Sequence, residues 1–77
     1  MENKNFKIDE SYKKALLFCI NNNAASVSLL QRWLYYGYET ACKIIDWMTD
    51  MGHITPANGA KPREVLLSLS DFEKLYN

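Results

Sequence analysis

The residue types that usually carry catalysis or bind metals are few among the 77 residues of this sequence. His53 is the single histidine, and it has no cysteine or carboxylate partner at the spacing of metal ligands. Ser26 and Ser28 match no nucleophile motif, and Ser26 is better explained as a helix cap. The sequence also lacks a glycine-rich phosphate-binding loop. We therefore expect no enzyme, no catalytic residue, no metal site and no cofactor.

Aromatic side chains are dense in one short stretch, which contains Trp33, Tyr35, Tyr36 and Tyr38. Exposed aromatic residues are enriched at protein interfaces, and they also form platforms on which the bases of single strands stack. The alternative is that they pack with Trp47 and shield a small core. We expect Tyr38 to belong to the core, and we leave both interpretations open for Trp33 and Tyr35.

The composition limits the class of protein. Apolar residues make up 48% of the chain, enough for one small domain, and nine basic residues balance nine acidic ones. The N-terminus lacks the apolar run of a signal peptide, and no stretch has the length of a membrane span. Cys19 and Cys42 lie among apolar neighbours, without metal or redox spacing. We expect a cytoplasmic protein with reduced cysteines and no membrane partner.

The elements that must position these side chains begin with two helices. A helical period starts at Asp9, whose side chain suits the N-cap, and ends at the asparagines 21–23. A second helix is expected from Ser26 as its cap, ending in residues 35–37, where Gly37 would supply the turn. A short helix, a tight turn and a longer helix are typical of a helix-turn-helix.

The third helix is expected over residues 38–51, with Gly52 just past its end. Its spacing predicts one inward face, made of Tyr38, Ala41, Ile44 or Ile45, and Met48. The opposite face would be charged and consists of Glu39, Lys43, Asp46 and Asp50. Glu39 and Lys43 are also spaced for a favourable ion pair.

The rest of the chain changes period. Residues 53–56 and 63–68 are expected to form two short strands around a loop with Asn-Gly at its tip. Ser70 and Glu73 match a capping box that would open a short C-terminal helix. The predicted fold class is therefore mainly α with a small β-hairpin (α+β). Its architecture would be a winged helix-turn-helix, with a three-helix core, a two-stranded wing and a short C-terminal helix.

The expected organisation is one domain with two short appendages. Residues 1–8 are polar and are expected to form a flexible N-terminal segment. Residues 9–70 would form the winged-helix domain, and residues 71–77 a short C-terminal helix packed on it. The initiating Met1 and the capped last helix favour a natural or near-natural unit.

Several segments in combination carry a family resemblance. They are Ala-Ser-Val-Ser-Leu-Leu-Gln-Arg at 25–32, Gly37-Tyr38, Ile-Ile-Asp at 44–46 with Met48 and Gly52, and Lys-Pro-Arg-Glu-Val-Leu at 61–66. Over about residues 9–68 the chain resembles the γ domain of FtsK/SpoIIIE-type DNA translocases, as a divergent, stand-alone member. The resemblance implies the winged-helix module of a bacterial chromosome-segregation motor. In that family the module recognises short guanine-rich sequences and can contact the XerD recombinase.

The resemblance also implies which residues would contact double-stranded DNA. Helix 38–51 would be the recognition helix in the major groove, and the wing 56–63 would lie on the phosphate backbone. The residues at the matching positions are Arg32, Tyr38, Glu39, Thr40, Lys43, Lys61 and Arg63. The alternatives are structural: Lys43 would pair with Glu39, and Arg63 with Glu64 or Asp46.

The departures from the family pattern concern the residues that would read bases. Two arginines of the turn are replaced by Trp33 and Tyr35, an asparagine of the recognition helix by Glu39, and an arginine by Thr40. Arginine is the usual reader of guanine. Residues 37–52 carry a net charge of minus two, with Lys43 as their single basic residue. We therefore expect altered sequence specificity.

The alternative function is a protein-interaction module without direct DNA binding. Its contact surface would be an aromatic patch of Trp33, Tyr35 and Tyr36. The partner would be a recombinase, a translocase subunit or a second copy of the chain in a homodimer.

Overall fold

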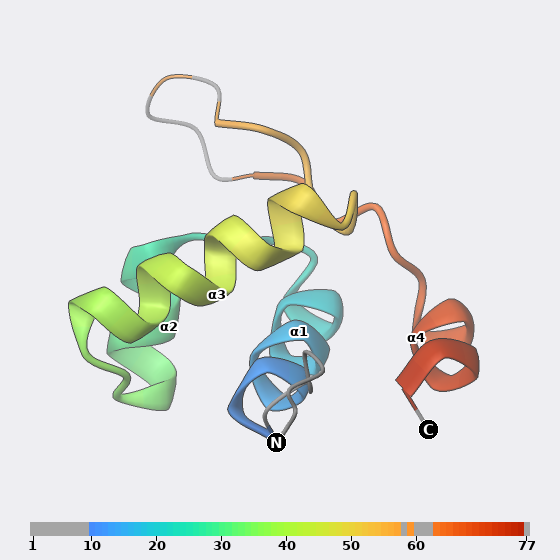
Figure 1. Cartoon of the computed structure of the whole chain (residues 1–77), viewed down its shortest axis with the longest axis horizontal. Helices are drawn as coiled ribbons and strands as arrows, with labels where there is room; N and C mark the ends of the chain where they lie inside the picture. Colours follow the sequence, from blue (N-terminus) through green and yellow to red (C-terminus); the bar gives the residue numbers. More distant parts are fainter. Residues whose placement is uncertain (1–9, 58, 60–62, 77) are drawn as a thin grey trace, which may run out of the picture.

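The computed structural model describes residues 10–57, 59 and 63–76, and its regular elements are four helices. These are α1 (Glu10–Asn22), α2 (Val27–Leu34), α3 (Tyr38–Asp50) and α4 (Leu69–Tyr76). Helix α3 packs against both α2 and α1, and α4 packs against α1. Helix α1 therefore lies between the α2–α3 pair and α4 (Figure 1).

Helix α1 supplies one side of the core. Ala15, Leu16 and Cys19 are fully buried, at the spacing of one helical face. The helix ends as predicted in the asparagines, and Asn23 takes the left-handed conformation with φ 54°. The predicted cap Asp9 and the predicted flexible segment 1–8 lie outside the described residues.

Helix α2 begins at the predicted cap but ends differently from the prediction. The backbone N–H of Leu29 donates to Oγ of Ser26 over 3.1 Å, which satisfies one free donor of the first turn. The residue that turns the chain after α2 is Tyr35, with φ 61°. Gly37 instead has φ −65° and ψ 162° and precedes α3 as an extended residue. The glycine was predicted to supply the turn, and that prediction is wrong.

Helix α3 buries the face that its spacing predicts, with one exception. Ala41, Ile44, Ile45 and Met48 are at most 2% exposed. Tyr38 was predicted to point inward, but it is 67% exposed, because the first turn of α3 extends beyond the end of the core. Gly52, at φ 78°, ends the helix as expected.

An aromatic cluster closes the core on the side of α4. The ring of Trp47 packs edge-on against Tyr12 and His53, and at a tilt against Tyr76. His53 is 5% exposed, and its Nε2 lies 2.7 Å from Oη of Tyr76. We call Tyr12, Trp47, His53 and Tyr76 the aromatic cluster. It ties α1, α3 and α4 together.

The predicted winged helix with its two-stranded hairpin is wrong, because no strand occurs in the described residues. Two isolated bridges take its place, Ala25 with Arg63 and Ile54 with Val65. The first bridge pairs the predicted second strand with the segment before α2 instead of with the predicted first strand. Beyond the second bridge, the N–H groups of Leu66 and Leu67 both donate to the carbonyl of His53, so no regular ladder forms. The architecture described here is four helices with irregular connections.

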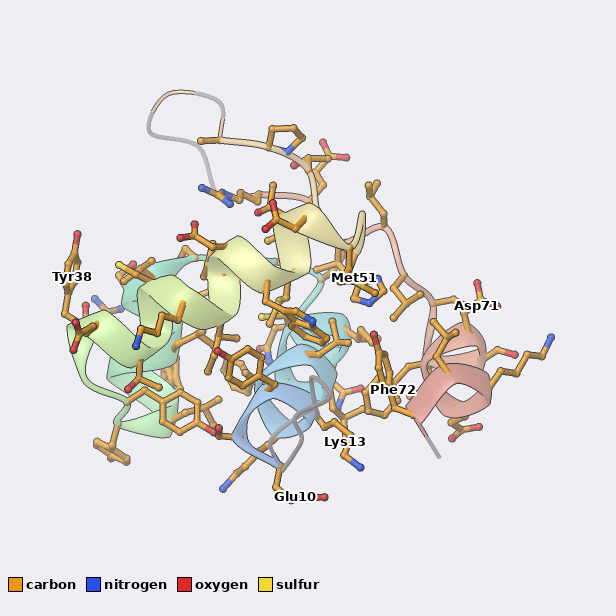
Figure 2. All side chains as sticks on the ribbon, in the orientation of Figure 1. Glu10, Lys13, Tyr38, Met51, Asp71 and Phe72 are labelled. Atoms are coloured by element: carbon orange, nitrogen blue, oxygen red, sulfur yellow. The ribbon has the colours of Figure 1, made fainter. Side chains whose placement is uncertain are left out.

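Helix α4 begins earlier than the sequence predicted. The N–H of Asp71 donates to Oγ of Ser68 over 3.1 Å, so Ser68 is the cap and the predicted role of Ser70 is wrong. The helix contains no fully buried residue, and it contacts α1 through the half-buried Phe72 and Tyr76. Figure 2 shows Phe72 turned toward α1 and Asp71 turned away from it. This helix is therefore an outer layer on the core.

Candidate functional site

The first turn of α3 presents three consecutive exposed side chains. The N–H of Ala41 donates to the carbonyl of Gly37 over 2.9 Å, which starts the helix without a side-chain cap. Tyr38, Glu39 and Thr40 are all exposed. Tyr38 projects away from the body, far from α4 (Figure 2). We call Tyr38, Glu39, Thr40 and Lys43 the α3 surface.

The charged face of α3 is exposed as predicted, but its expected ion pair does not form. Glu39, Lys43, Asp46 and Asp50 all face solvent. Among the described residues the ion pair is that of Lys13 with Glu10 on α1, at 3.3 Å. Neither Glu39 nor Lys43 has an ion-pair partner among residues 10–57, 59 and 63–76. The pairing of Lys43 with Glu39, offered as an alternative to DNA contact, is therefore wrong in this structure.

The aromatic side chains before α3 separate into exposed and packed ones. Trp33 is 59% exposed and Tyr35 is 87% exposed, so neither packs on Trp47, and that interpretation is wrong. Tyr36 is half-buried, and its hydroxyl donates to the carbonyl of Ser11 over 3.2 Å. That bond anchors the α2–α3 turn to α1. Arg32 is exposed on the last turn of α2.

Arg63 has a structural role that the sequence did not reveal. Its backbone exchanges two hydrogen bonds with Ala25, at 3.0 and 3.1 Å. Its Nη1 donates to Oγ1 of Thr49, which in turn donates to the carbonyl of Ile45. The alternative interpretation, in which Arg63 pairs with Glu64 or Asp46, is therefore wrong in this structure. The predicted DNA contact Lys61 lies outside the described residues.

Thr49 was missed as the partner of Arg63 because the two residues are far apart in sequence. The threonine offers only a hydroxyl on the last turns of α3, and nothing in its neighbourhood singles it out. The contact depends on the bridge between Arg63 and Ala25, which a local pattern cannot predict. Sequence reasoning could have found it only through a prediction of that pairing.

Burial shifts the pKa of three titratable groups inside the molecule. Burial lowers the pKa of His53 below its ordinary value and raises the pKa of Tyr76. Burial also raises the pKa of Cys19 to about 11, which keeps its thiol protonated near neutral pH. The residues that the structure describes contain no group of His, Cys, Asp and Glu that could hold a metal ion. Within the same residues, no helix is both long and apolar enough to cross a membrane.

Comparison with known proteins gives a consistent result. A family model described as "Ftsk gamma domain" matches residues 7–68. DNA translocase SpoIIIE of Bacillus subtilis (strain 168) is 43% identical over 67 residues, which is 87% of this chain and 8% of the relative. DNA translocase SftA of the same strain is 46% identical over 63 residues, or 82% of this chain and 7% of the relative. DNA translocase FtsK of Borreliella burgdorferi is 48% identical over 56 residues, or 73% of this chain and 7% of the relative.

The match covers most of this chain and a small part of each relative. The chain spans less than a tenth of the length of these DNA translocases, so the similarity concerns one unit of much longer proteins. The matched residues include α1, α2 and α3 and the α3 surface, whereas α4 lies beyond them. The resemblance read from the sequence is thereby confirmed, and the chain belongs to the FtsK gamma domain family.

Proposed function

We propose that this chain binds double-stranded DNA by placing the N-terminal half of α3 in the major groove. The observation that carries the proposal is the α3 surface, where Tyr38, Glu39, Thr40 and Lys43 all face solvent. Side chains at the N-terminal end of a recognition helix are the ones that contact base edges in helix-turn-helix proteins. Membership of a domain family found in DNA translocases supports the same ligand.

The arrangement of α2 and α3 supports this orientation. The two helices pack against each other across a connection of three residues, 35–37. This arrangement leaves the first turn of α3 exposed beyond the core. Arg32, on the last turn of α2, is exposed and would contact phosphate. Lys61 is proposed as a further phosphate contact on the strength of the family resemblance alone.

The charge distribution predicts modest affinity. Asp46 and Asp50 occupy the C-terminal half of the exposed face of α3 and would repel phosphate. Part of the guanidinium of Arg63 is held by Thr49, which makes Arg63 a weaker phosphate contact than its charge suggests. We therefore expect DNA to approach the N-terminal end of α3 and to gain few phosphate contacts. The salt dependence of binding should be correspondingly shallow.

The test is fluorescence anisotropy with a labelled guanine-rich duplex, a scrambled duplex and a single strand. Titrations between about 50 and 200 mM salt cover the range in which phosphate contacts weaken. We expect duplex binding that falls with salt and that weakens about tenfold in Lys43→Ala, since a good base contact contributes roughly 1–3 kcal/mol. Lys74→Ala is the matched control, because it removes an exposed lysine from α4. Absence of duplex binding at the lowest salt would refute the proposal.

A second candidate function rests on the exposure of Trp33 and Tyr35. Large exposed aromatic side chains are typical anchors of protein interfaces. The partner would be a recombinase, a translocase subunit or a second copy of this chain. If duplex binding fails, this interpretation predicts that the chain associates with such a protein partner and that Trp33→Ala abolishes the association. Sedimentation of the chain alone at increasing concentration would test the homodimer.

A further inference from the structure

The carboxylate of Glu39 is unusual on a surface that should meet DNA. It lies in the first turn of α3, is exposed, and has no ion-pair partner among the described residues. Lys43, one turn further along, is equally exposed and equally unpaired. A lysine and a glutamate at this spacing commonly neutralise each other, but here both remain available. The pair presents an acceptor and a donor side by side.

We propose that Glu39 and Lys43 make this chain select a cytosine and a guanine about two base pairs apart. The inference rests on the proposed binding of duplex DNA through α3. Four residues of helix rise about 6 Å, and successive base pairs are about 3.4 Å apart. A helix lying along the groove therefore brings the two side chains to positions about two base pairs apart.

The choice of cytosine follows from what each base offers a carboxylate in the major groove. Guanine presents two acceptors, N7 and O6, and both repel the carboxylate of Glu39. Thymine presents an acceptor and a methyl group and offers no donor. Adenine offers a donor at N6, but the acceptor N7 stands beside it. Cytosine offers its N4 amino group without a neighbouring acceptor, so it is the best partner for Glu39.

The opposite argument applies to Lys43. Its ammonium group has three donors and no acceptor, so it matches the two acceptors of guanine. The cytosine read by Glu39 is itself paired with a guanine on the other strand. A site that satisfies both residues therefore carries a cytosine and a guanine at set positions.

A purely structural role for Glu39 gives a different expectation. An acidic residue in the first turn interacts favourably with the N-terminal end of the helix dipole. If that were its whole role, its replacement would change the stability of the chain and its affinity for every duplex equally. Base preference at a single position is the readout that separates the two roles.

The experiment is selection from a randomised duplex library at about 50 mM salt, followed by sequencing of the bound fraction. For the wild type we expect cytosine at one position with roughly tenfold discrimination, which corresponds to about 1.4 kcal/mol. Glu39→Gln should change that preference to adenine, because glutamine pairs with N6 and N7 of adenine. Lys43→Ala should lose the guanine preference about two base pairs away.

Asp50→Asn is the matched control, since it removes the same charge from the other end of α3. It should strengthen binding to all duplexes without changing the preferred bases. If Glu39→Gln also strengthens binding uniformly and keeps the wild-type preference, the inference is refuted while the proposed function stands. If the wild type and all variants retain no duplex, the proposed function fails and the inference fails with it.

Discussion

The two ends of α3 differ in what their side chains are bonded to. At the N-terminal end the α3 surface is exposed, and Glu39 and Lys43 have no ion-pair partner in the described part of the chain. At the C-terminal end Trp47 lies inside the aromatic cluster, and Thr49 is bonded to Arg63. We call the N-terminal end of α3, with its exposed side chains, the free end, and the C-terminal end, with Trp47 and Thr49 in contact with the rest of the fold, the committed end. Replacements at the two ends should therefore affect different measurements.

The largest effect expected at the committed end is that of Trp47→Ala. The substitution removes a ring that contacts Tyr12, His53 and Tyr76, and we expect a loss of about 3 kcal/mol in the free energy of unfolding. Urea denaturation followed by circular dichroism measures it. Tyr38→Ala is the matched control at the free end, where the exposed ring should change stability by less than about 0.5 kcal/mol. Equal losses in the two variants would contradict the division of α3 into two ends.

A smaller loss is expected when the bond between Arg63 and Thr49 is removed. Thr49→Val keeps the shape of the side chain but leaves Nη1 of the half-buried Arg63 without its acceptor. A hydrogen bond to a charged group contributes about 1.5–3 kcal/mol, and the exposed part of Arg63 reduces this to about 1 kcal/mol. The free energy of unfolding from urea titration tests it.

Thr40→Val is the control for that measurement. It makes the same chemical change at the exposed first turn of α3, where the hydroxyl of Thr40 forms no hydrogen bond within the described part of the chain. It should leave stability unchanged within about 0.5 kcal/mol. A loss as large as that of Thr49→Val would show that the cost arises from valine in a helix and not from Arg63.

The difference between the two ends also shows what the sequence could predict. Local patterns identify the buried face of α3, the cap Ser26 and the exposed charged face, because they depend on helical spacing and on neighbouring backbone groups. The predicted two-stranded wing is wrong although one bridge, between Ile54 and Val65, joins the two predicted segments. Strand pairing depends on distant partners, and Arg63 pairs with Ala25 instead of extending that bridge into a ladder. The structural role of Arg63 was missed for the same reason.

The free end gave a different kind of error. Tyr38 has the spacing of a core residue, but the first turn of α3 lies beyond the packed helices. Helical spacing gives the direction of a side chain and does not tell where the neighbouring element ends. The turn after α2 is a related case. Glycine is the residue that most readily adopts a left-handed conformation, so Gly37 was expected to turn the chain, but Tyr35 has that conformation instead. Both errors lie at the α2–α3 turn.

A stabilising change is expected at Tyr35, which has a left-handed backbone conformation that costs most residues about 1 kcal/mol. Tyr35→Asn should raise the free energy of unfolding by about 0.5 kcal/mol, because asparagine tolerates this conformation and the exposed ring contributes little packing. Thermal or urea denaturation measures the gain. Gly37→Ala is the comparison variant in the same turn, because Gly37 has an ordinary φ of −65° and a Cβ added there would meet no atom within 4 Å. If Tyr35→Asn is destabilising, the ring must contribute a contact that its exposure does not show.

The smallest expected effect is a pH dependence that arises at the aromatic cluster. Burial lowers the pKa of His53 in the folded state below its ordinary value of about 6.5, so the unfolded chain binds its proton first as pH falls. The stabilisation from neutral His53 is therefore complete above pH 6.5 and is lost as pH falls through the lower folded-state pKa. Urea denaturation of the wild type and of His53→Gln at about pH 7, 6 and 5 isolates this contribution, since carboxylate titration is common to both. The stability difference between them should shrink toward acid pH, and a difference that stayed constant would show that His53 is not held neutral against Trp47 and Tyr76.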